Sequence, residues 1–270
     1  MTDQHDHQHV EPWTVTAINV AADSGNDIHD DDAARELGYE RALVAGVTTY
    51  GYLLRQVVAA LGDSWLDRGT VEVRLRQPAY AGERFIVTAE HAPLASIRAA
   101  AVRDDGVVVA TADATPGAPG PLPARAHPLV PPRDEPYAPV RSALDGVAHF
   151  PTVEYTIDDA WQHKLLTDIG NDLTVFGDRG IVHPVIYGDL ANLSLMHSVA
   201  LGPWIHARSR VRHHRPLRVG ETVSVRPRIH ELTTDNGAEF LTLDTAVVVD
   251  DLLVARIKHA VIYAMNRRPT

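Results

Sequence analysis

Apolar residues recur at helical spacing in one segment of each half of the chain. In the first half these positions are Tyr50, Leu53, Leu54, Val57, Val58 and Leu61. Gly62 follows them, where a helix end favours a left-handed residue. In the second half, residues 185–201 are apolar on nearly every side, which predicts a buried helix.

Gly51 and Gly188 lie inside these helices. Because glycine costs about 1 kcal/mol relative to alanine there, we expect close packing at both.

Each predicted helix is followed by segments in which apolar and polar residues alternate, as in half-buried strands. The first of these segments contains Val71, Val73 and Leu75. Further strands are expected at 84–91, 97–103, 107–112, 222–231, 239–249 and 252–264. Asp104-Asp105-Gly106 and Asp235-Asn236-Gly237 fit hairpin turns between them. Helix and antiparallel sheet segregated in this way predict an α+β fold.

Several motifs of the first half recur in the same order in the second. Pro78 and Gly82 are matched by Pro216 and Gly220, each 138 positions later, and the corner residue Trp65 is matched by Trp204. Such recurrence indicates that the chain is a tandem duplication. A proline-dense segment at 115–145 predicts a semi-extended linker between an N-terminal unit at 10–114 and a C-terminal unit at 146–266.

Charge and composition exclude several classes of function. The formal charge is −10, from 35 acidic and 25 basic residues, which argues against nucleic acid or an anionic membrane as a partner. The chain has no cysteine, so a disulfide framework, a cysteine nucleophile and a thiolate metal site are excluded. No apolar run approaches the roughly 20 residues that cross a bilayer, and the first twelve residues lack a signal-peptide core. We therefore expect a cytoplasmic protein.

The histidines near the N-terminus do not predict a metal centre. His5, His7 and His9 are spaced like a weak chelator, but they lie in a polar tail and no fourth ligand accompanies them. We therefore expect no bound metal.

Residues 23–50 carry the most specific pattern in the chain. The matching positions are Asn26, Ile28, His29, Ala34, Gly38, Tyr39, Ala42 and Gly46. They resemble the G-D-x-N-P-[IL]-H box and the A-H-G-M turn of MaoC-like (R)-specific enoyl-CoA hydratases. Pro78–Glu83 and Pro216–Glu221 resemble that family's Pro-x-x-x-Gly-[DE] strand. The resemblance implies a double hotdog, in which each half wraps a sheet around one helix. It also implies an acyl-thioester substrate such as acyl-CoA and no separate cofactor, because coenzyme A is part of the substrate.

The sequence departs from the family pattern at the position of the catalytic aspartate and throughout the second copy of the box. Ser24 occupies the position of the family's catalytic aspartate, and Asp23 lies one residue too early. In the second half the positions equivalent to Asn26 and His29 hold Lys164 and Thr167, so that copy has no box.

The first-half helix start is the better candidate for an oxyanion site. The first turn of a helix offers free N–H groups and the positive end of the helix dipole. Gly46 and Val47 occupy that turn, and glycine lets a thioester carbonyl approach closely. Pro184 removes the equivalent N–H in the second half.

The candidate catalytic residues are Asn26, His29, Asp23, Ser24 and His183. The further candidates for substrate binding are Asn171, Asp172, Arg210 and Arg212. Because arginine suits phosphate geometry, the two arginines are candidates for the phosphates of coenzyme A. Plainer explanations stand beside these roles: a cap for Asn26, a core histidine for His183, a turn for Asn171 and Asp172, and a solvated strand face for the arginines.

Three functions remain open on this reasoning. Thioester hydrolysis is favoured, because it needs only an oxyanion donor and a group that activates water. The alternative is enoyl-CoA hydration, which would use His29 with Asp23 or a second-half carboxylate. The third is a non-catalytic acyl-CoA-binding subunit. A homodimer of two such chains is a further arrangement that we consider.

Overall fold

The computed structural model describes residues 10–117 and 125–265. The first half contains β1 (Trp13–Thr16), η1 (Asp27–His29), α1 (Asp31–Glu36), α2 (Gly46–Leu61), α3 (Trp65–Arg68), β2 (Thr70–Leu75), β3 (Arg84–Ala92), β4 (Ser96–Arg103) and β5 (Val108–Thr115). The second half contains α4 (Arg141–Leu144), β6 (Val153–Thr156), α5 (Asp159–Asp168), α6 (Val175–Asp178), α7 (Ile186–Ser198), β7 (Ile205–His213), β8 (Thr222–Asp235), β9 (Ala238–Val249) and β10 (Leu252–Ala264).

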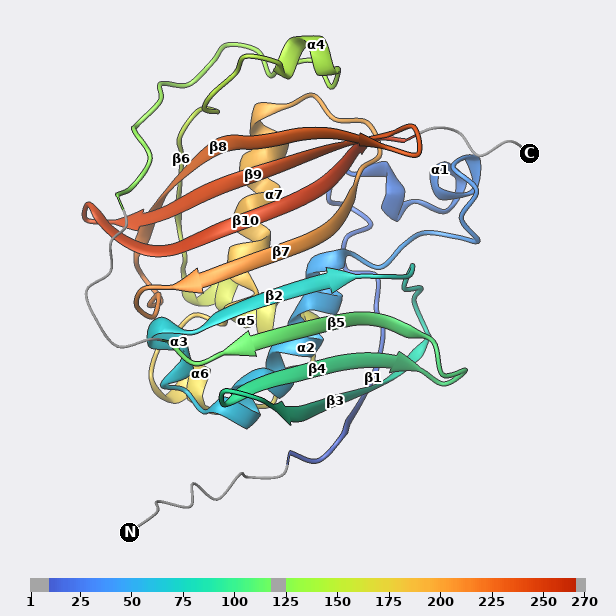
Figure 1. The fold of residues 1–270 in the computed structure, drawn as a ribbon, viewed down its shortest axis with the longest axis vertical. Coiled ribbons are helices and arrows are strands. Elements are labelled where there is room, and N and C mark those ends of the chain that lie inside the picture. The colour runs from blue at the N-terminus through green and yellow to red at the C-terminus, as the bar shows by residue number, and fades with distance from the viewer. Residues whose placement is uncertain (1–9, 118–124, 266–270) are drawn as a thin grey trace.

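These strands form one antiparallel sheet of ten strands within the described ranges (Figure 1). Its order is β1-β3-β4-β5-β2-β7-β10-β9-β8-β6. Each half therefore contributes five strands in equivalent order, and the halves meet where β2 pairs with β7. The predicted α+β class, the two hairpins and the six further strands are confirmed. The histidines of the N-terminal tail lie outside the described residues.

The register of β2 against β7 shows where the symmetry axis between the two halves passes through the sheet. Glu72 faces Arg210 across this junction, and these two residues are 138 positions apart. That separation equals the offset of the repeated motifs. In an antiparallel pair, only the residue on the axis faces its own repeat equivalent. The two halves are therefore related by a pseudo-twofold axis through this pair.

The helix predicted at 185–201 ends earlier than expected. The structure ends α7 at Ser198, and Val199 leaves it with extended backbone angles. The cause is a strand-like segment of the linker: Tyr137 donates to the Ser198 carbonyl and accepts from the Ala200 amide, at 2.8 and 2.9 Å. These hydrogen bonds replace the helical ones, so helical periodicity alone overestimated the length of α7.

The two long helices lie on the same side of the sheet, one from each half (Figure 1). A Cβ on Gly51 of α2 would lie 2.4 Å from Ile169 Cγ2, and one on Gly188 of α7 would lie 3.2 Å from Tyr50 Cδ1. Both glycines therefore allow close packing between the halves, as predicted. No helix within the described residues combines the length and apolar character needed to cross a membrane.

The described part of the linker packs against the second half. Arg256 donates to the Arg125 carbonyl at 3.1 Å, and Arg226 donates to the His127 carbonyl at 3.3 Å. Further along, Val130 and Thr152 exchange hydrogen bonds of 3.0 Å. The segment predicted as a spacer is thus held on the protein surface. The unit boundaries at 10–114 and 146–266 stay predictions, because one continuous sheet joins the two units.

Asp244 of β9 anchors the same region through charge. Its carboxylate is 4% exposed and accepts from Arg256 at 2.6 Å and from Arg228 at 2.9 Å, while His127 Nε2 lies 3.7 Å away. Burial by itself raises the pKa of this carboxyl, but His127 and Arg256 together hold that pKa well below its usual range. Asp244 is therefore ionised throughout the neutral pH range.

We expect Gly51→Ala to destabilise the protein. The added methyl would overlap Ile169, and overpacking costs about 1–3 kcal/mol, which outweighs the gain in helix propensity of about 1 kcal/mol. Urea unfolding measures the change. Gly177→Ala is the matched control, because a Cβ at Gly177 meets nothing within 4 Å. Equal stability of the two variants would contradict the proposed packing.

We expect Asp244→Asn to lower the unfolding free energy at pH 7 by about 1–3 kcal/mol, because two arginines lose their ionised partner. Since the folded pKa is depressed, the stabilisation is present above the usual carboxyl pKa and is lost as pH falls below it. The difference between wild type and variant should therefore shrink between pH 7 and pH 3 in denaturant unfolding. Asp113→Asn, at an exposed ion pair with Arg98, should change stability little.

Candidate functional site

A cavity of about 780 Å³ lies at the seam between the two halves. Its walls come from the segment around η1, the turn into α2, the end of β2, one face of α5, one face of α7 and the start of β7. The volume lies within the range of small-molecule pockets. Both halves therefore build a single site.

His29 at the end of η1 is the best-placed base. Its Nδ1 lies 2.7 Å from the Leu43 carbonyl oxygen. A carbonyl can only accept, so Nδ1 carries the hydrogen, and Nε2 of the neutral ring keeps a free lone pair. Burial lowers the pKa of His29, although the hydrogen bond to Leu43 acts in the opposite direction. The imidazole is therefore neutral at pH 7 and able to take a proton.

The start of α2 provides unused hydrogen-bond donors beside His29. The amides of Thr48 and Thr49 both bond to the Ala45 carbonyl, at 3.0 and 3.3 Å. The amides of Gly46 and Val47 have no hydrogen-bond acceptor among the described residues, and no side chain caps this end of the helix. Two free N–H groups at the positive end of a 16-residue helix can stabilise a developing oxyanion.

The reason for glycine at position 46 is different from the expected one. A Cβ on Gly46 would lie 2.4 Å from Leu75 Cδ1 and 3.0 Å from His206 Nδ1. Side chains of the protein therefore occupy that face of the turn. Gly46 is required because β2 and β7 pack directly against the helix start.

Asn26 joins the halves next to His29. Its Oδ1 accepts from the Trp204 amide at 3.1 Å, and its Nδ2 donates to the Trp204 carbonyl at 3.0 Å. Oδ1 also caps η1 through the Ile28 amide at 3.4 Å. The side chain is 5% exposed and its polar atoms are all engaged. Asn26 therefore acts as a clamp that ties the η1 segment, with His29 at its end, to Trp204, and its bond to Ile28 matches the cap that was the plainer explanation.

Comparisons with known proteins bear on the fold. No family model matches the chain, and no curated relative matches its sequence. Solved structures match over nearly the whole length. One, described as a MaoC domain protein dehydratase from Chloroflexus aurantiacus J-10-fl, is 14% identical with a TM-score of 0.59, covering 98% of this chain and 100% of its own. Another, a MaoC-like dehydratase, is 11% identical with a TM-score of 0.62, covering 95% and 98%.

A third match is a conserved hypothetical protein from Mycobacterium tuberculosis, which is described as having a double hotdog fold. It is 12% identical, with a TM-score of 0.57 and coverage of 94% of this chain and 96% of its own. This chain is a double hotdog. The fold suggested by the sequence motifs is thereby confirmed.

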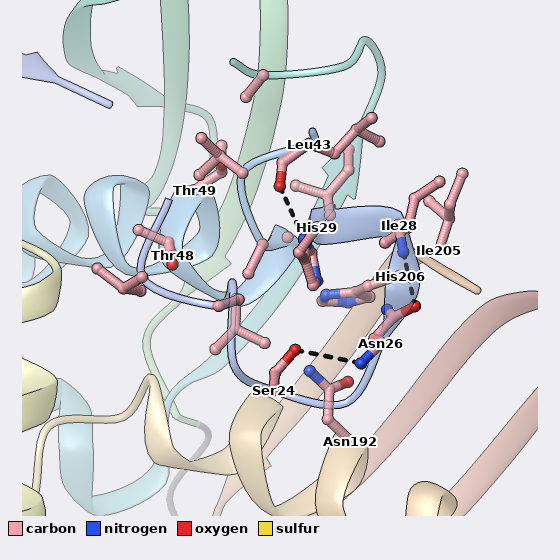
Figure 2. Close-up of a pocket in the computed structure, with 18 of the residues that line it drawn as sticks. Ser24, Asn26, Ile28, His29, Leu43, Thr48, Thr49, Asn192, Ile205 and His206 are labelled. Atoms are coloured by element: carbon pink, nitrogen blue, oxygen red, sulfur yellow. Dashed lines mark hydrogen bonds between the residues drawn. The ribbon is translucent and has the colours of Figure 1, made fainter. Parts of the chain in front are cut away.

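Two of the predicted polar residues lie at the edge of the cavity of this double hotdog. Asp23 and Ser24 both line it and both are exposed. Ser24 Oγ accepts from the Asn26 amide at 3.4 Å, and Ser24 lies opposite Asn192 of α7 in Figure 2. The place that the resemblance gives to a carboxylate is therefore occupied by a neutral hydroxyl.

His183 lies away from the cavity lining. It is fully buried, its Nδ1 accepts from the Val185 amide at 3.1 Å, and its ring centroid lies 4.5 Å from that of Phe176. Burial lowers its pKa to about 3. The geometry matches the plainer explanation, a core histidine that shapes the start of α7.

The predicted substrate-binding residues of the second half also lie outside the cavity lining. Asp172, next to Asn171, forms a bidentate ion pair with Arg55 of α2, at 2.9 and 3.0 Å. Arg210 and Arg212 are exposed and share one face of β7, as the alternation predicted. Their expected contact with coenzyme A is not supported by this placement.

Arg76, at the exposed end of β2, is the arginine that lines the cavity. It directly follows Leu75, the last residue of β2, and its Nε donates to Thr111 Oγ1 at 3.2 Å. It replaces Arg210 and Arg212 as the candidate for a phosphate contact.

Sequence reasoning missed His206, which β7 places at the start of α2 (Figure 2). Its Nε2 lies 2.8 Å from Ser209 Oγ, which in turn lies 2.8 Å from His259 Nδ1. Burial lowers the pKa of His206 to about 4. The three side chains are therefore a neutral chain of hydrogen bonds beneath the helix start. Strict alternation along β7 would place His206 and Ser209 on opposite faces, and a register shift at Ala207 turns both inward, which the sequence did not show.

Asp189 and Asn192 were also missed, although both line the cavity from α7. Burial raises the pKa of Asp189 to about 6. The available signal was their chemical type: a carboxylate and an amide, three positions apart, in a helix that is mostly apolar. Spacing of this kind places both on one helix face.

We expect Asn26→Ala to destabilise the protein strongly, because the buried amide and carbonyl of Trp204 would each lose a partner, at about 1–3 kcal/mol each. Denaturant unfolding followed by tryptophan fluorescence measures the loss. Asn26→Asp keeps the acceptor but not the donor, so it should rescue only part of the loss. Wild-type stability in Asn26→Ala would disprove the clamp.

Proposed function

We propose that this double hotdog hydrolyses acyl thioesters, with coenzyme A as part of the substrate. The observation that carries the proposal is the meeting, at one cavity, of His29 with the free amides of Gly46 and Val47. Hydrolysis needs one base and an oxyanion site, and this arrangement supplies both. Ser24, where the hydratase box has its carboxylate, favours hydrolysis over hydration.

The reaction follows from these positions. The substrate carbonyl oxygen lies at the Gly46 and Val47 amides, and His29 Nε2 takes a proton from a water whose oxygen attacks the carbonyl carbon. The tetrahedral oxyanion accepts hydrogen bonds from both amides. On collapse the carbon–sulfur bond breaks, and the leaving thiolate receives the proton from the His29 imidazolium. The products are a carboxylic acid and a free thiol.

Hydration is the second candidate, and Asp189 is the observation that favours it. This carboxyl lines the cavity from the second half, and its pKa of about 6 suits proton exchange near neutral pH. It is a carboxylate of the kind that a hydratase would need together with His29. A binding subunit without turnover is the third candidate.

We expect the protein to release free thiol from acyl-CoA. The variant His29→Gln should lower kcat by about 10²–10⁴-fold with little change in KM, because the base acts mainly in the transition state. Since only the neutral imidazole is a base and its pKa is lowered, kcat/KM should be flat above pH 6.5 and fall below it. The measurement is a thiol assay on a panel of acyl-CoAs. His197→Gln, an exposed site on α7, is the control.

The two alternative functions predict different results with acyl-CoA substrates. Loss of enoyl absorbance with crotonyl-CoA, without thiol release, would favour hydration. Tight acyl-CoA binding without either reaction would favour a binding subunit.

A further inference from the structure

We propose that the acyl group bound in this cavity carries a hydrogen-bond donor, a hydroxyl or an amino group, and that Asp189 binds this donor. The inference rests on the proposed function for the position of the thioester. It concerns the wall of the cavity that α5 and α7 build.

Asp189 is the fourth residue of α7, and its position is set by its neighbour Gly188. A Cβ on Gly188 would lie 3.2 Å from Tyr50 Cδ1 and 3.4 Å from Val47 Cγ1. This close contact holds the first turn of α7 against the first turn of α2. Asp189 therefore borders the same cavity as the Gly46 turn, from the opposite half.

Among the described residues no lysine or arginine forms an ion pair with the Asp189 carboxylate, although the charge of Lys164 acts on it and favours its ionised form. Lys164 of α5 lines the same wall but is bonded to Asp168 at 2.5 Å. The Trp161 side chain donates a hydrogen bond to Asp189. A carboxylate has two oxygens and about four acceptor sites, so it retains acceptor capacity toward the cavity.

Asn192, one turn further along α7, adds a second acceptor. Its Oδ1 is buried and has no donor among the described residues. Asp189 and Asn192 are three residues apart, so both lie on one face of the helix, and both line the cavity. A plain alkyl chain packed here would desolvate these acceptors without offering a hydrogen. A hydroxyl or ammonium group satisfies them.

The position along α7 indicates where on the acyl group the donor lies. Asn192 faces Ser24, next to the reacting groups, in Figure 2. Asp189 lies about 4.5 Å earlier along the helix axis and shares its wall with Trp161 and Lys164. The donor therefore lies on the part of the acyl group that runs along the wall built by α5 and α7.

The test measures binding, so it needs no turnover. Isothermal titration of the full chain compares hydrolysis-resistant S-alkyl thioethers of coenzyme A. Their matched six-carbon chains are plain, or carry one hydroxyl or one amino group at successive positions along the chain. We expect a hydroxylated or aminated chain to bind about 10- to 100-fold more tightly than the plain chain, as hydrogen bonds to charged groups do. Asp189→Leu should abolish this preference, and Asn192→Leu should weaken it.

Two further variants make the result specific. Asp178→Leu makes the same chemical change at an exposed site outside the cavity lining and should keep the preference. Asp189→Asn removes only the charge: it should keep a preference for the hydroxyl but lose one for the ammonium group. A circular dichroism melt checks that each variant is folded.

Equal or tighter binding of the plain chain by wild type would overturn the inference, as would a donor preference that survives in folded Asp189→Leu. If discrimination is seen but no thioester is hydrolysed, the proposed function fails and this inference stands. If thioesters are hydrolysed without discrimination, the reverse holds.

Discussion

The antiparallel pairing of β2 with β7 is the constraint on which the rest of the structure depends. It joins two five-stranded half-sheets edge to edge and sets α2 and α7 on the same side of the result. It also places the start of β7 against the start of α2, so that His206 packs on Gly46. Without this junction the cavity would have only one wall.

The duplication gives two structurally equivalent positions for a site, and the candidate catalytic residues are present at only one of them. In the first half, the segment around η1 carries His29, held by Leu43 and by the Asn26 clamp. In the second half, α5 occupies the equivalent stretch and contributes side chains to the wall of the first-half cavity. The second copy therefore supports and shapes the site of the first.

Two groups of polar residues, one on the second half-sheet and one at the cavity, differ in how far their hydrogen bonds are satisfied. On the second half-sheet, Asp244 is surrounded by arginines and holds the linker. At the cavity, the Gly46 and Val47 amides and the Asn192 oxygen have no partner within the described ranges. Buried polar groups normally find partners. The free amides and the Asn192 oxygen belong to residues that line one cavity, and the proposed substrate would supply a partner to each.

Local pattern by itself determined the strands other than β1, β6 and β7, the hairpins, the two long helices and the duplication, because alternation, helical spacing and a constant offset are properties of the sequence alone. The resemblance to the MaoC-like box, which is also read from the sequence, brought His29 and Gly46 into one candidate site. Tertiary structure alone decided that Asn26 binds the Trp204 backbone, 178 residues away, that His206 lies beneath the Gly46 turn, and that Asp189 faces the cavity. A pattern of apolar and polar positions encodes which side of an element is buried. It does not encode which neighbour lies against that side, and at this site the neighbour comes from the other half.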